Sequence, residues 1–191
     1  MLIKEGDVYI RTSLISYMNH TKKNIFLTGA PSSGKTTVIK KVIERLPIAS
    51  NGFYTEEERK GEKRTGFLMK TLDARTGYLA HEDIKSEFAV RRFGVSIENI
   101  ETIAVPSIAP VDDHVIILDE IGKMECFSPV FKEAAVKALN CANIVIGTIA
   151  FGGDEFILEI KKRQDLEIIE VTPENRDSLP DLILEKVSSL L

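Results

Sequence analysis

Eight consecutive residues carry the clearest chemical signal in the sequence, because their types and spacing suit the binding of phosphate groups. They follow the pattern G-x-x-x-x-G-K-[ST] and are Gly29, Ala30, Pro31, Ser32, Ser33, Gly34, Lys35 and Thr36. Backbone N–H groups of such a loop point at phosphate oxygens, and the positive end of the helix that follows adds to the attraction. The two glycines allow backbone angles and a close approach that a side chain would block.

Three side chains at the end of this loop have distinct expected roles. We expect Lys35 to reach the β- and γ-phosphates of a nucleoside triphosphate as a point charge, and the Thr36 hydroxyl to bind Mg²⁺. Thr37 is a further candidate, for the α-phosphate. A chance glycine-rich turn is the alternative interpretation. The loop, however, lies between an expected strand at 24–28 and an expected helix at 35–46, which is the context that the motif requires.

Two consecutive acids, Asp119 and Glu120, follow the apolar run 115–118. If the run is a buried parallel strand, the acids emerge at the carboxyl edge of the sheet, beside the phosphate loop. We then expect Asp119 to bind Mg²⁺ through water, and Glu120 to orient and deprotonate an attacking water. The alternative is a pair of solvated acids in a turn, but the preceding phosphate loop favours the catalytic interpretation.

The acceptor of the phosphoryl group separates a hydrolase from a kinase built on the same loop. A phosphotransferase works better when water is excluded, usually by a mobile lid that carries arginines. The sequence has no obvious lid with clustered arginines, although Arg91, Arg92 and the stretch 59–64 keep a small-molecule or nucleotide kinase open. A nucleotide-dependent binding or regulatory module, acting for example on RNA, is the third alternative.

Length and composition exclude several classes of protein. The 191 residues suit one domain, and 43% hydrophobic with 28% charged residues is ordinary globular usage, which excludes a disordered or collagen-like chain. The net charge of −4 gives no global basic field for nucleic acid or an anionic membrane, while a local basic patch stays open. No apolar run approaches the roughly 20 residues that span a bilayer.

The N-terminus and the cysteines point to the cytoplasm. Residues 1–9 carry Lys4, Glu5 and Asp7 and lack an apolar signal core, so we expect no secretion. The only cysteines are Cys126 and Cys141, and this usage favours reduced thiols over a disulfide or a metal site. We expect a cytoplasmic protein, with a monomer favoured.

The order of the apolar runs predicts a three-layer α/β fold. Continuously apolar strands alternate with helices, which is typical of a mainly parallel sheet covered on both faces. From 48 to 97, short aromatic and β-branched pieces between glycines instead predict an antiparallel hairpin extension. The expected strands are 24–28, 52–58, 64–71, 78–81, 88–95, 114–118, 143–149 and 166–171. The expected helices are 7–19, 35–46, 96–103, 128–139, 154–162 and 182–191.

Several strings together resemble the thermostable nucleoside-triphosphatase family, which includes the cancer-related nucleoside triphosphatase. The loop 29–37 is general, but Gly52-Phe53-Tyr54-Thr55-Glu56-Glu57-Glu58-Arg59 and Leu118-Asp119-Glu120-Ile121-Gly122-Lys123-Met124-Glu125 are specific. Arg64-Thr65-Gly66-Phe67 and Asn175-Arg176-Asp177 add to the match. The resemblance covers about residues 24–190.

This resemblance implies a RecA-like P-loop fold and Mg²⁺-dependent hydrolysis of ATP, GTP, CTP and UTP with little selectivity for the base. The chain would form a single P-loop domain over residues 1–191. Residues 1–23 depart from the family pattern, because such proteins usually begin near the first strand. This segment is a candidate helical extension, arm or dimer contact.

Three further residues are candidates for the nucleotide site. Lys123 lies just past the acids, where it would stabilise charge on the γ-phosphate in the transition state, and Gly122 would let the backbone approach the nucleotide. Arg176 follows the last expected strand and would stack on any base without reading its edge. The alternatives are a surface lysine, and a capping or ion-pair role for the arginine.

Three charged residues of the expected hairpin have two possible roles. Ion pairing is the simpler one, and a place in the active site is the other. The residues concerned are Glu57, Arg59 and Arg64.

Overall fold

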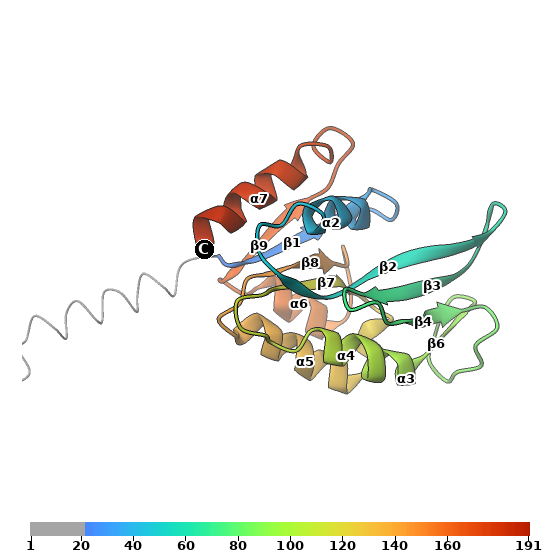
Figure 1. The fold of residues 1–191 in the computed structure, drawn as a ribbon. Coiled ribbons are helices and arrows are strands. Elements are labelled where there is room, and N and C mark those ends of the chain that lie inside the picture. Colours follow the sequence, from blue (N-terminus) through green and yellow to red (C-terminus); the bar gives the residue numbers. More distant parts are fainter. Residues whose placement is uncertain (1–21) are drawn as a thin grey trace, which may run out of the picture.

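A computed structural model describes residues 22–191, and Figure 1 shows their arrangement. They form a nine-stranded sheet in the order β5-β6-β4-β3-β2-β7-β8-β1-β9. The strands are β1 (Asn24–Thr28), β2 (Ser50–Lys60), β3 (Lys63–Thr71), β4 (Thr76–His81), β5 (Ala89–Val90), β6 (Phe93–Val95), β7 (Val115–Ile121), β8 (Val145–Ile149) and β9 (Leu166–Glu170). The helix expected at 7–19 lies outside the described residues.

The sheet has a parallel half and an antiparallel half. Strands β2, β7, β8, β1 and β9 are parallel, and β8 lies between β1 and β7. From β2 the sheet continues antiparallel through β3, β4, β6 and β5. The expected parallel α/β sheet is therefore confirmed, and its antiparallel extension is larger than one hairpin.

Helices cover both faces of the parallel half. In Figure 1, α2 and α7 lie on one face, and α3 to α6 lie on the other. The helices are α2 (Lys35–Ile43), α3 (Ile97–Asn99), α4 (Val105–Ser107), α5 (Pro129–Asn140), α6 (Glu155–Lys161) and α7 (Leu179–Leu190). A π-helical segment, Ile100–Ala104, joins α3 to α4. No helix in the described range is long and apolar enough to cross a membrane.

Alternation along the strands explains the two hydrophobic cores. On β1, Ile25 and Leu27 pack in the core with α2 and α7, whereas Phe26 packs in the core with α5 and α6. Successive side chains of a strand point to opposite faces, so a strand buried on both sides must be apolar at every position. All five residues of β1 are buried, so this strand must be covered by helices on both faces. The result is a fold of three layers.

The expected helix starts are confirmed where a hydroxyl side chain caps them. The Ser96 Oγ accepts a hydrogen bond from Asn99 N at 3.2 Å, and the Ser128 Oγ accepts one from Phe131 N at 3.1 Å. Such caps satisfy backbone donors that a first helical turn leaves unpaired. The helix after Ser96, however, continues irregularly to Ser107, beyond the expected end.

Several expected boundaries were wrong. The final helix begins at Leu179, not 182, because Pro180 is tolerated in a first helical turn. The strand expected at 88–95 is divided into β5 and β6 by a turn in which Arg91 has a φ of 55°. Strand β7 continues to Ile121, so Asp119 and Glu120 belong to the strand and do not follow it.

Candidate nucleotide site

The loop between β1 and α2 has the backbone geometry that its glycines predict. Gly29 has a φ of 142° and Gly34 a φ of 102°, and these values favour glycine over any residue with a side chain. A methyl group on Gly29 would also lie 2.9 Å from the carbonyl oxygen of Val171. Ser32 adopts a left-handed φ of 63°. The outer residues Ala30, Pro31, Ser32 and Thr37 are exposed, whereas Gly29 is buried.

Lys35 folds back over this loop. Its Nζ donates hydrogen bonds to the carbonyl oxygens of Gly29 at 3.1 Å and Ala30 at 3.2 Å. The ammonium group therefore lies at the loop whose N–H groups are expected to hold phosphate. Burial raises the pKa values of Asp119 and Glu120, and the positive charge of Lys35 opposes that rise.

Asp119 is a fully enclosed carboxylate held by three donors. Its Oδ2 accepts hydrogen bonds from Thr36 Oγ1 at 2.7 Å and from Thr55 N at 3.4 Å. Its Oδ1 accepts one from the hydroxyl of Thr148 on β8. Burial raises the pKa of Asp119, and the two hydroxyl donors oppose that rise. The structure therefore brings Asp119 and Thr36 together, as the sequence predicts.

Glu120, near the end of β7, and Glu125, just beyond the strand, lie on either side of Gly122 in the sequence. Burial of the carboxyl group and then repulsion from Asp119 raise the pKa of Glu120. Glu125 is 2% exposed, and burial followed by repulsion from Glu120 holds its pKa well above the usual range. Glu125 has no expected role from the sequence alone. The available signal was a third acid five positions after Glu120, within the same family-specific string.

The other two cations expected at the site are exposed. Lys123 lies in the turn after β7 and forms no ion pair with any residue of the described range. Arg176 lies in the segment between β9 and α7, and a methyl group on Gly34 would be 3.7 Å from its Cδ. Arg176 is therefore beside the phosphate loop, although it is 142 positions away from Gly34 in the sequence.

The charged hairpin residues are paired with each other. Glu57 bridges Arg59 at 2.6 Å and also binds Arg64. The simpler interpretation, ion pairing, is what the structure has. Within residues 22–191 there is no cluster of three or more His, Cys, Asp or Glu side chains that could hold a metal ion. A metal here would depend on the Thr36 and Asp119 oxygens together with oxygens of a ligand.

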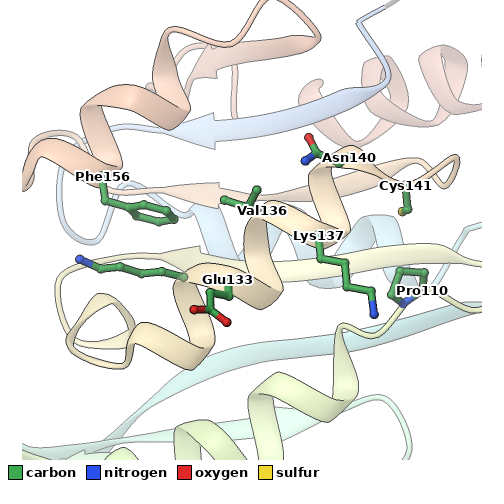
Figure 2. Close-up of a pocket in the computed structure, with 8 residues that line it drawn as sticks. Pro110, Glu133, Val136, Lys137, Asn140, Cys141 and Phe156 are labelled. Carbon is green, nitrogen blue, oxygen red and sulfur yellow. The ribbon is translucent and has the colours of Figure 1, made fainter.

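A hollow of about 680 Å³ lies elsewhere, along α5 (Figure 2). Figure 2 shows Phe156 of α6 at one end and Pro110 and Cys141 at the other. None of the residues expected at the nucleotide site lines it. Its full lining is Pro110, Lys132, Glu133, Val136, Lys137, Asn140, Cys141 and Phe156.

Comparison with known proteins agrees with this arrangement. A family model described as NTPase matches residues 24–184. The chain belongs to the NTPase family. Members of this enzyme family include the nucleoside-triphosphatase THEP1 of Thermotoga maritima, which is 44% identical over 84% of this chain and 92% of its own. The human cancer-related nucleoside-triphosphatase is 36% identical over 84% of this chain and 95% of its own.

Solved structures of this family have the same fold. The crystal structure of THEP1 from Aquifex aeolicus matches with a TM-score of 0.76 and 37% identity, over 88% of this chain and 98% of that one. The solution structure of the human protein matches with a TM-score of 0.72 and 34% identity, over 87% and 97%. The resemblance noted from the sequence strings is confirmed.

Proposed function

We propose that this protein is a Mg²⁺-dependent nucleoside triphosphatase that hydrolyses ATP, GTP, CTP and UTP to the diphosphate and phosphate with low base selectivity. The observation that carries the proposal is the hydrogen bond between Thr36 and Asp119. This bond joins the end of the phosphate loop to Asp119 of β7, the residue that precedes Glu120. The names of the relatives support hydrolysis of nucleoside triphosphates.

The loop and Lys35 bind the triphosphate. Backbone N–H groups of the loop surround the β-phosphate at the N-terminus of α2, and Lys35 exchanges its two carbonyl partners for phosphate oxygens. Thr37 binds the α-phosphate. Gly122 lets the backbone approach the γ-phosphate from the other side.

Thr36 and Asp119 hold the metal. The Thr36 hydroxyl and the Asp119 carboxylate lie together and are hard oxygen ligands, which suit Mg²⁺. The remaining ligands of this ion are usually waters and phosphate oxygens. When bound, Mg²⁺ neutralises charge on the β- and γ-phosphates. Asp119 would bind the metal directly or through water. Hydrogen bonds from Thr148 and Thr55 keep its carboxylate oriented.

Glu120 accepts the proton of the attacking water. A general base works best with a pKa near the operating pH, and the environment of Glu120 shifts its pKa in that direction. Lys123, on the exposed turn, reaches the γ-phosphate and stabilises the charge that develops there. These roles make Lys35, Glu120 and Lys123 the catalytic residues.

Arg176 accounts for the low selectivity. It lies beside Gly34, and a planar guanidinium stacks on any base face without reading hydrogen-bonding groups. The order of strands supports assignment to the RecA-like P-loop proteins, because β8 separates the loop strand β1 from the acid-bearing β7. We further propose one domain over residues 1–191 that acts as a cytoplasmic monomer.

Phosphate release from the four ribonucleoside triphosphates, with Mg²⁺ and with a chelator, tests the proposal. We expect release from all four with similar kcat/KM and none without metal. The Arg176→Ala variant should raise KM for all four alike, whereas Lys123→Ala should lower kcat. Lys60→Ala is the control, since this exposed lysine sits at the far end of the β2–β3 hairpin. Phosphate that appears only on an added acceptor would contradict the proposal and indicate a kinase.

A further inference from the structure

The carboxyl groups of buried Glu125 and half-buried Glu120 meet at one point beside the expected catalytic site. A methyl group added to Gly122 would lie 2.5 Å from Oε1 of Glu120 and 2.8 Å from Oε2 of Glu125. Both oxygens therefore border the space that the missing side chain leaves, within reach of a direct hydrogen bond or one bridging water. The spacing Glu120, Gly122, Glu125 creates this arrangement.

The turn that carries Glu125 is fixed by backbone hydrogen bonds. Cys126 N donates to the carbonyl oxygen of Gly122 at 3.0 Å, and Ser128 N donates to that of Glu125 at 3.1 Å. The Ser128 side chain then caps α5. Glu125 thus lies in a short 3-10 turn, Glu125–Phe127, directly before α5 and not on a free loop.

Among residues 22–191, no cation forms an ion pair with Glu125. No ion pair in the described range involves Glu120 or Glu125, and Asp119 adds a third nearby carboxyl group. Burial and then repulsion from Glu120 disfavour the charged form of Glu125 more strongly than the backbone N–H groups of Glu125 and Gly122 favour it, so the group takes up a proton. The raised pKa of Glu125 agrees with this, and a protonated carboxyl group has an O–H to donate.

We propose that Glu125 is a positioning residue for Glu120: its carboxylic acid donates a hydrogen bond, directly or through one water, to the Glu120 carboxylate across Gly122. The bond holds Glu120 in the orientation in which it faces the attacking water. This inference rests on the proposed hydrolysis and on Glu120 as its base. Gly122 is required because any side chain there would fill the gap between the two groups.

Two variants of similar size and shape separate positioning from packing. Glu125→Gln keeps a donor, since its amide N–H can bind the Glu120 carboxylate, whereas Glu125→Met removes it. We expect Glu125→Met to lower kcat about 10- to 100-fold with KM within about twofold, the usual range for residues that orient a reacting group. Glu125→Gln should keep kcat within about threefold of the wild type.

A double-mutant cycle provides the second readout. In a Glu120→Gln background, Glu125→Met should lower kcat by less than about twofold, because residues that act as a unit are not additive. Glu101→Gln is the control: its carboxylate binds Ser128, three positions after Glu125, and lies outside the pair. Thermal melting of every variant shows whether it folds.

The outcomes distinguish this inference from the proposed function. The inference is overturned if folded Glu125→Met and Glu125→Gln hydrolyse equally fast, or if Glu125→Met has its full effect in the Glu120→Gln background. If the wild-type protein releases no phosphate, or Glu120→Gln is as active as the wild type, the proposed function itself fails.

Discussion

Thr36 Oγ1 donates a 2.7 Å hydrogen bond to Asp119 Oδ2 across 83 positions of sequence. The bond connects the first turn of α2 to β7, and Thr148 on β8 holds the second carboxylate oxygen. Because β8 lies between β1 and β7, the register of three parallel strands sets the distance between loop and acid. The proposed metal ligands are therefore oriented by the sheet itself.

Replacing either partner of this bond should change the Mg²⁺ requirement. We expect Thr36→Ala and Asp119→Asn each to raise the Mg²⁺ concentration for half-maximal turnover by roughly tenfold or more, since a charge-assisted contact is worth about 1.5–3 kcal/mol. Thr36→Ser keeps the hydroxyl and is the matched control. A Mg²⁺ titration of turnover measures the effect, and an unchanged midpoint in both variants would contradict the assignment.

Lys35→Ala should abolish turnover and weaken binding of the triphosphate. Lys35 neutralises phosphate charge in the ground state and in the transition state, so both steps lose a contact worth more than tenfold in affinity, about 1.5–3 kcal/mol. Kd from titration with a non-hydrolysable triphosphate and kcat from phosphate release are the measurements. Lys41→Ala, on the same helix and half exposed, is the control. Near-normal hydrolysis by folded Lys35→Ala would disprove the role.

Glu120→Gln should separate catalysis from binding. The amide keeps the shape of the side chain but cannot take the water proton, so we expect kcat to fall by about 10²–10⁴. Triphosphate affinity should stay the same or increase slightly, because a negative charge near the γ-phosphate is removed. Normal hydrolysis by this variant would place the base elsewhere, with Glu57 the next candidate.

Glu125 should make stability depend on pH in an unusual direction. Its folded-state pKa is raised above the ordinary 4.5, so the folded protein binds a proton that the unfolded chain releases. The free energy of unfolding should therefore fall as pH rises from about 4.5 through the folded-state pKa. Asp119 and Glu120 face the same cluster and shift in the same direction.

Glu125→Gln removes one of these protons and should flatten this pH dependence. Urea unfolding of the nucleotide-free protein between pH 4.5 and 8 compares the two slopes. Equal slopes for wild type and variant would show that Glu125 titrates normally.

The meeting of Thr36 with Asp119 was predictable from the sequence, whereas the other contacts of the candidate residues were predictable only in part. The loop motif and the pair Asp119 and Glu120 state their chemistry locally, and parallel topology implies that they meet. The position of Arg176 beside Gly34 depends on where the segment after β9 returns, and no local pattern encodes that path.

The enclosure of Glu125 was not predictable for a related reason. From the sequence alone, an acidic residue is expected to be exposed to solvent. Only the three-dimensional packing shows that Glu125 is enclosed. The same limit applies to the antiparallel half of the sheet. Short strands such as β5 and β6 depend on tertiary pairing, so their boundaries follow from neighbours and not from their own residues.

Two glycines of the β2 region should respond very differently to alanine. Gly52 has a φ of 121° and pairs with Ile117 of β7, and a methyl group there would overlap the Ile117 backbone carbonyl. Gly61 has a φ of 63° in the exposed hairpin turn, with nothing within 4 Å of an added methyl group. Gly61→Ala should therefore lower the free energy of unfolding by about 1–2 kcal/mol, the cost of a left-handed non-glycine residue. Gly52→Ala adds a backbone clash that separates β2 from β7, so we expect a loss above about 4 kcal/mol or no folded protein. Urea unfolding of both variants measures these losses. If the two variants lose a similar free energy of unfolding, β2 does not need glycine to pair with β7.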